Sequence, residues 1–253
     1  MSFHFDGAVR ALALGLILAL PVAPGLRADD YLPPKASDSV IAAIKDERAK
    51  MEKTLVADPK NTACRMQLGE ILCDLAVNGD EDASSGAVKL FKTLHQELPQ
   101  DPEILADYGN ACTIYAQYCS IFTKLSWVHD GFNYLDAAVK AAPDNVGVHV
   151  VRALNSSQVP AFLNREPIAR ADFDWLLQHI RSNSREFTPA ALRLVYYYDG
   201  IFALKHGDSA SVQLLAQAET VPPPPDDRLA ARIESSLKAA RAKFPPVQIS
   251  QDP

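Results

Sequence analysis

Apolar side chains recur at intervals of three and four residues through most of this chain, and no useful stretch alternates apolar with polar residues. The first pattern gives a helix one apolar face, whereas a half-buried strand needs the second. The sequence therefore predicts an all-α protein. The expected helices, separated by Asp-Pro, Pro-Asp-Asn, Asn-Gly and Thr-Pro turns, are 38–56, 61–77, 83–98, 102–118, 128–142, 145–158, 166–182, 189–206, 208–219 and 226–243.

Composition narrows the class of protein further. Of the 253 residues, 48% are hydrophobic and 22% charged, the balance of a globular protein that buries a core. There are 25 Lys and Arg against 31 Asp and Glu, so the net charge is -6. Nucleic-acid binding depends on a basic surface that gathers phosphates. We therefore expect no nucleic-acid partner.

The N-terminal segment has the features of a secretory signal peptide. Residues 11–20 are apolar, a run too short for a helix that crosses a bilayer core of ~30 Å. Two prolines follow, and Ala28 supplies a small residue for cleavage. We expect 1–28 to be removed, leaving a periplasmic or secreted protein with no membrane span. A retained anchor is the alternative, because Asp6 offsets the charge of Arg10.

One packing pattern occurs three times along the chain. A small residue is followed four positions later by a large apolar one, three positions after that by another apolar or small residue, and in two cases by a proline. The segments are Ala87-Phe91-Leu94-Pro99, Gly131-Leu135-Ala138-Pro143 and Ala169-Phe173-Leu176. The small residue lets two helices approach, the large one fills the space between them, and proline ends the helix. Together with the upstream Leu68-Gly69 pair, this pattern resembles the tetratricopeptide repeat (TPR), a helix-turn-helix unit.

The resemblance covers about residues 38–182 and implies antiparallel helix pairs stacked as an irregular TPR-like α-solenoid. The family period is about 34 residues, but Pro59 and Pro99 are 40 apart, and Pro99 and Pro143 are 44 apart. Insertions between paired helices, around 78–82 and 120–130, account for the difference. A plain helical bundle is the alternative.

The segments after the expected array differ from it in composition. The predicted organisation is a signal peptide at 1–28, a TPR-like helical repeat domain at 29–220, a Pro-rich linker at 221–225, a C-terminal capping helix at 226–244 and a disordered tail at 245–253. The capping role rests on a single apolar stripe that can cover the open end of a solenoid.

In such an array the first helix of each pair lines a concave groove that holds peptides or partner helices. The resemblance implies a partner-binding groove lined by Met66, Glu70, Asp74, Glu103, Asn110, Leu154 and Gln158. Family members that hold an acidic C-terminus use Lys, Asn and Arg side chains on these helices. Only Asn110 matches that set in type, so we do not expect recognition of an acidic C-terminus.

Four cysteines in an exported chain favour disulfides. Cys64 and Cys73 share one expected helix, as do Cys112 and Cys119, and their spacing along it exceeds the reach of a bridge. Alignment of the Gly69 repeat with the following one places Cys73 and Cys112 at matching heights. A Cys73–Cys112 disulfide is the prediction, and reduced thiols in the core are the alternative.

No catalytic or metal-binding signature is present. The chain lacks HExxH, GxSxG, GxGxxG and P-loop motifs, and no cysteine pair has the spacing of a zinc knuckle. We expect no metal, no cofactor and no enzymatic activity. The prediction is a non-catalytic exported scaffold or adaptor that binds another protein of the cell envelope. One alternative is a periplasmic small-molecule binder. The other is an enzyme or subunit of envelope polysaccharide machinery, in which Glu70, Asp74 and Asp107 would converge in the groove.

Overall fold

The computed structural model describes residues 35–224 and 227–245, and in these ranges all regular structure is helical. The all-α prediction is therefore confirmed. The α-helices are α2 (Asp38–Ala57), α3 (Thr62–Val77), α4 (Glu81–Glu97), α5 (Pro102–Tyr115), α6 (Ile121–Ala141), α7 (Val146–Ser157), α8 (Glu166–Asn183), α9 (Pro189–Lys205), α10 (Ala210–Thr220) and α11 (Ala230–Lys243). Short 3-10 turns are η2 (Ala116–Tyr118), η3 (Ala161–Leu163) and η4 (Ser184–Glu186).

Local side chains set the helix starts. The Asp101 carboxylate accepts hydrogen bonds from the amides of Glu103 and Ile104 at 3.0 and 3.1 Å, and Pro102 occupies the first turn of α5. Helices α3, α4, α7 and α9 are capped in the same way: the side chains of Asn61, Asp80, Asn145 and Thr188 each accept a hydrogen bond from a backbone amide of the first turn. Because these caps satisfy amides that the helix leaves unbonded, most helices begin within two residues of the prediction.

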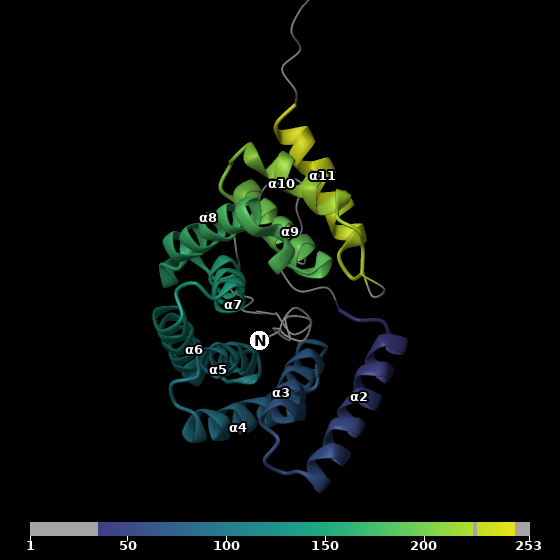
Figure 1. Ribbon diagram of the computed structural model, residues 1–253. Coiled ribbons are helices and arrows are strands. Elements are labelled where there is room, and N and C mark those ends of the chain that lie inside the picture. The colour runs from purple at the N-terminus through teal and green to yellow at the C-terminus, as the bar shows by residue number, and fades with distance from the viewer. Residues whose placement is uncertain (1–34, 225–226, 246–253) are drawn as a thin grey trace, which may run out of the picture.

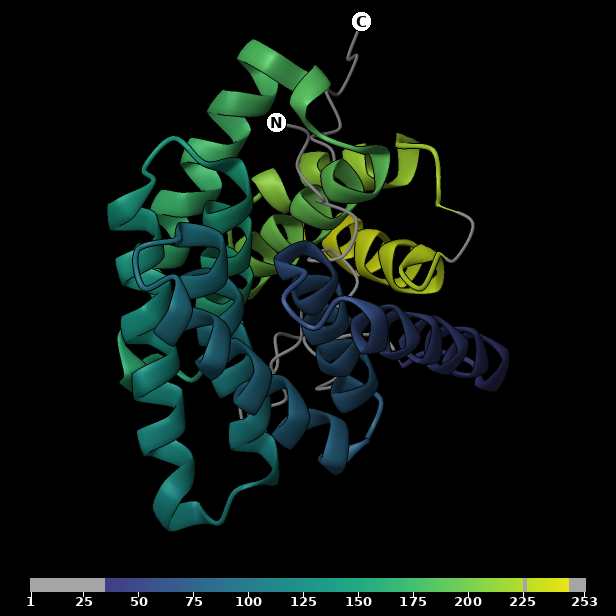
Figure 2. The same ribbon diagram turned by 60° about the horizontal axis from the view of Figure 1, so that its bottom comes forward.

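Helix α6 is the main correction to the predicted helix bounds. It begins at Ile121, so residues 121–130 form its first half and not an inserted loop. No proline or glycine lies between Ser120 and Gly131 to stop the helix. Its first turns project past the neighbouring helices (Figure 2) and leave Ile121, Phe122 and Leu125 exposed.

The helices pack as consecutive pairs, α3 with α4, α5 with α6, α7 with α8 and α9 with α10. The pairs follow one another around a ring (Figure 1), with α3, α5, α7 and α9 on its inner side and α4, α6, α8 and α10 outside. Each of α3, α5 and α7 also contacts the next member of the inner set. We call these four the inner helices.

Small residues allow the close crossings within the pairs. A Cβ atom added to Gly109 of α5 would lie 2.7 Å from the carbonyl oxygen of Gly131 on α6 and 2.9 Å from Leu135 Cγ. One added to Gly69 of α3 would meet the Phe91 ring of α4 at 2.4 Å. The apolar positions of the repeated pattern are all buried, among them Phe91, Leu135 and Phe173. The packing role predicted for this pattern is therefore confirmed.

Two hydrophobic clusters run through the ring. One joins α2 to α5 and the other extends from α5 to α11, and Trp127 and Tyr134 of α6 pack against both. Helix α11 lies against α10 and α9 and buries Ile233, Leu237 and Ala240.

An ion pair joins the two ends of the helical array. Nη1 and Nη2 of Arg228, just before α11, donate to Oδ1 and Oδ2 of Asp74 on α3 at 2.9 and 3.2 Å. Asn78, at the end of α3, donates to Asp74 Oδ1 at 3.2 Å and accepts from the Ala36 amide at 2.7 Å. Segments from both ends of the described chain therefore meet at the C-terminal end of α3.

Several predicted segments lie partly or wholly outside the described residues. These are the signal peptide at 1–28, the end of the Pro-rich linker and nearly all of the tail at 245–253. Residues 221–224 follow α10 without helical structure. Over 35–224 and 227–245, none of the helices combines the length and apolar character needed to cross a bilayer.

Candidate functional site

The inner helices carry the residues that the sequence predicts for a groove, and the structure divides them into two groups. Met66, Glu70 and Glu103 are half-buried. The remaining four, Asp74, Asn110, Leu154 and Gln158, are buried.

Three of the buried residues hold the fold together, which corrects their predicted place on a solvent-facing groove. Asp74 accepts both Arg228 hydrogen bonds. Asn110 Oδ1 accepts from Nδ2 of Asn155 on α7 at 3.1 Å. Leu154 is 1% exposed and belongs to the larger core cluster. Sequence spacing places a residue on a helix face, but the neighbour packed against that face decides whether the residue meets water.

Acidic side chains come together where α3 meets α5. Asp107, in the middle of α5, is 9% exposed, and among the described residues no hydrogen bond to its carboxylate forms. Burial, followed by repulsion from Glu70, Glu103 and Asp101, holds the pKa of Asp107 well above its usual range. We call Glu70, Glu103 and Asp107 the acidic subsite.

Cys73 borders the acidic subsite. Burial and then the nearby Asp107, Glu70 and Asp74 carboxylates hold the pKa of its thiol well above the usual range, and Cys112 also contributes. Glu70, Asp74 and Asp107 therefore all lie near enough to Cys73 for their charges to act on its thiol. Of these three, Asp74 is engaged by Arg228.

The predicted Cys73–Cys112 disulfide is not formed, because all four cysteines are free thiols. Cys73 and Cys112 are 2% and 0% exposed, and they are near enough for the charge on one to act on the other. Burial raises the pKa of Cys112 to about 12. Disulfide formation requires a thiolate, and this environment disfavours the thiolate at both positions.

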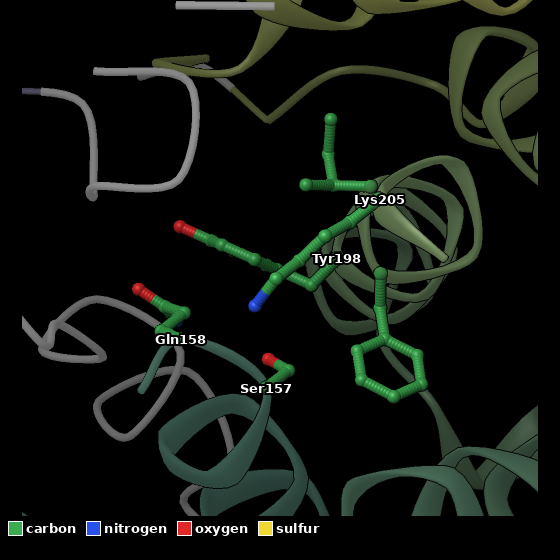
Figure 3. A pocket seen from close by; sticks show the side chains of 6 residues that line it. Ser157, Gln158, Tyr198 and Lys205 are labelled. Atoms are coloured by element: carbon green, nitrogen blue, oxygen red, sulfur yellow. The ribbon is translucent and has the colours of Figure 1, made fainter. Parts of the chain in front are cut away.

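A small hollow lies at the other end of the inner side, between the end of α7 and the second half of α9. It is lined by Ser157, Gln158, Tyr198, Lys205 and two apolar side chains of α9. The tips of Gln158, Tyr198 and Lys205 converge there (Figure 3). Gln158 is 5% exposed, and its Oε1 has no hydrogen-bond partner although its Nε2 donates to the Leu154 carbonyl. The hollow has room for about one water molecule.

A buried polar network links α7 to α8, and sequence analysis did not detect it. Asp172 accepts from Arg152 Nε and Nη2 at 2.8 Å each and lies 2.7 Å from His149 Nδ1. Nε2 of His149 is 2.8 Å from the Pro143 carbonyl oxygen, and the His149 ring stacks on Trp175. Both Asp172 oxygens are occupied, so we assign this network to structure and not to ligand binding. No short motif marks it, because its members come from different helices.

Over residues 35–224 and 227–245, no three His, Cys, Asp or Glu side chains are grouped so that they can hold a metal ion. Comparison with protein-family models, with curated proteins and with solved structures finds no match to the chain. The site must therefore be interpreted from its own geometry.

Proposed function

We propose that this protein is a non-catalytic scaffold or adaptor of the cell envelope, built as an irregular TPR-like solenoid that holds a partner protein on its inner helices. The observation that carries this proposal is Gln158 Oε1, a buried acceptor at the end of the inner helix α7 that has no hydrogen-bond partner among the described residues. Buried polar groups are normally hydrogen-bonded. A bound protein segment supplies a donor for it.

The small-molecule alternative has less support. The hollow beside Gln158 accommodates about one water molecule, whereas ligand pockets usually enclose ~300–1,000 Å³. An enzymatic role for Glu70 and Asp107 has one observation in its favour, the raised pKa of Asp107 beside a second carboxylate. Glycosidic-bond hydrolysis by such a pair also needs space for a sugar between the two groups.

Site-specific photo-crosslinking in the host cell tests the proposal. A photoreactive residue at Met66, half-buried on α3 one turn before Glu70, should form a crosslink to a discrete partner protein. The same residue at Lys92, exposed on the outer helix α4, is the control. The same crosslinked species from both positions, or none from Met66, would contradict binding on the inner helices.

A further inference from the structure

The hollow at the end of α7 contains an acceptor whose orientation is fixed. Nε2 of Gln158 donates to the Leu154 carbonyl at 3.1 Å. Because a carbonyl oxygen can only accept, this bond determines which end of the Gln158 amide faces the hollow. Oε1 points inward (Figure 3), and among the described residues it has no hydrogen-bond partner. The hollow therefore needs a donor from outside the described part of the chain.

Two donor groups face the same space. The tips of Tyr198 and Lys205 converge on Gln158 (Figure 3), yet Gln158 Oε1 accepts a hydrogen bond from neither of them. Burial raises the pKa of Tyr198 to about 12, so its hydroxyl keeps its hydrogen at neutral pH. The Lys205 ammonium has three hydrogens and can serve a ligand in addition to a contact elsewhere. Ser157 uses its own hydroxyl hydrogen on the Leu154 carbonyl at 3.0 Å, so Tyr198 and Lys205 supply the donors of the hollow.

This arrangement restricts the chemical class of the missing group. A carboxylate has no hydrogen for Gln158 Oε1, and an ammonium group would be repelled by the ammonium of Lys205. The hollow has room for about one water molecule, which excludes a carboxamide or a sugar ring from its interior. A hydroxyl group has the size of a water molecule, with one hydrogen and two lone pairs. It can donate to Gln158 while it accepts from Tyr198 and Lys205.

We propose, on the basis of the function proposed above, that this hollow binds the hydroxyl group of a Ser or Thr side chain of the partner protein. In both residue types the hydroxyl lies on the first side-chain carbon, so the partner's backbone runs along the opening of the hollow between α7 and α9. Lys205 is half-buried, so the hollow reaches the surface on this side. Ile201 and Phe202 add an apolar lining, which suits the methyl group of Thr.

NMR titration of the whole chain with defined peptides tests this assignment. The probe is the terminally blocked tripeptide Ala-Thr-Ala. Its control is Ala-Val-Ala, in which a methyl group replaces the hydroxyl group. Ala-Thr-Ala should shift the proton–nitrogen signals of the Gln158 side-chain amide in a saturable way. The Kd of Ala-Val-Ala should be about tenfold higher, because a site that pairs with a hydroxyl group is left with unpaired polar atoms by its apolar analogue.

Variants assign the individual hydrogen bonds. Gln158→Met keeps the length of the side chain and removes the acceptor, and Tyr198→Phe removes one donor. Each should raise the Kd of Ala-Thr-Ala about tenfold and change that of Ala-Val-Ala little, measured by saturation transfer to the peptide signals. Gln213→Met, the same change at an exposed position of α10, should leave both Kd values unchanged. If neither Gln158→Met nor Tyr198→Phe folds, the comparison of the two peptides on the unaltered chain decides the outcome.

Three results would overturn the inference. The first is equal binding of Ala-Val-Ala. The second is the absence of any shift of the Gln158 signals with either peptide, which would mean that the hollow holds an ordered water only. The third is a shift of the same signals by methyl glucoside at lower concentration, which would assign the hollow to a carbohydrate hydroxyl. A discrete crosslink from Met66 together with any of these results refutes the Ser or Thr assignment alone and leaves the adaptor proposal in place.

Discussion

Breaking the Arg228–Asp74 pair should destabilise the protein far more than breaking an ordinary surface ion pair. The Asp74 side chain is 3% exposed and that of Arg228 is 16% exposed, and the contact is bidentate. Loss of one partner from a buried pair costs ~3–5 kcal/mol, because the other charge is left buried. Since Arg228 keeps some access to water, we expect Arg228→Gln to lower the free energy of unfolding by about 2–4 kcal/mol.

A double-mutant cycle isolates the pair from the other contacts of both side chains. Asp74→Asn, Arg228→Gln and the double variant are unfolded in urea and followed by circular dichroism. The coupling free energy should be about 1.5–3 kcal/mol. Arg48 and Glu52 on α2, an exposed pair at 2.8 Å, provide the control cycle and should couple by less than about 0.5 kcal/mol. Equal coupling in the two cycles would refute the expectation that this buried pair stabilises the fold more than an exposed one does.

Two further variants test the packing and the electrostatics. Gly109→Ala should lower the free energy of unfolding by about 1–3 kcal/mol, because its Cβ would meet the α6 backbone at 2.7 Å. Gly86→Ala, whose Cβ meets only the two Leu72 methyl groups at 3.4 and 3.8 Å, should be neutral or stabilising. A loss as large as that at Gly109 would contradict the close-crossing argument. Burial raises the pKa of Asp199 to about 7, whereas an Asp in an unfolded chain has a pKa of ~3.9. Because the folded state binds the Asp199 proton more tightly, the free energy of unfolding falls as the pH rises from about 4 through about 7. Asp199→Asn should therefore stabilise the protein by about 1–3 kcal/mol at pH ~8 and change little at pH ~4, measured by urea unfolding at both values; equal effects at the two values would contradict this.

Features encoded locally could be predicted from the sequence. Asp101 and Pro102 fix the start of α5 through contacts within four residues, and both residues can be recognised without a structure. The repeated pattern of a small, a large apolar and a further apolar or small residue around Phe91 and Leu135 likewise predicts the buried face of α4 and α6. Helix positions and the pairwise packing surfaces follow from such short-range signals.

Features that depend on how distant helices align could not be predicted. Arg228 and Asp74 are 154 residues apart, and nothing near either residue identifies its partner. The same holds for Asp172, which joins side chains of α7 to α8. The expectation that Asp74 and Asn110 face solvent was wrong for this reason. Cys73 and Cys112 lie near each other, but the burial and the acidic neighbours that raise the pKa of both thiols depend on the assembled fold.

The contact between Arg228 and α3 affects the order in which the helices of this array can unfold. In an open row of helix pairs each unit touches only its neighbours, so the terminal units fray first. Here α3, of the first helix pair, is held to Arg228, just before α11, so these two parts of the array cannot separate while that contact persists. The entropic cost of closing a loop grows only with the logarithm of its length, so the 154 residues between Asp74 and Arg228 lower the stability of the contact only modestly. They have a larger effect on the folding rate, because long-range contacts form slowly. Amide hydrogen exchange in α3 and α11 should therefore be as slow as in α7, and in refolding these end helices should gain protection last.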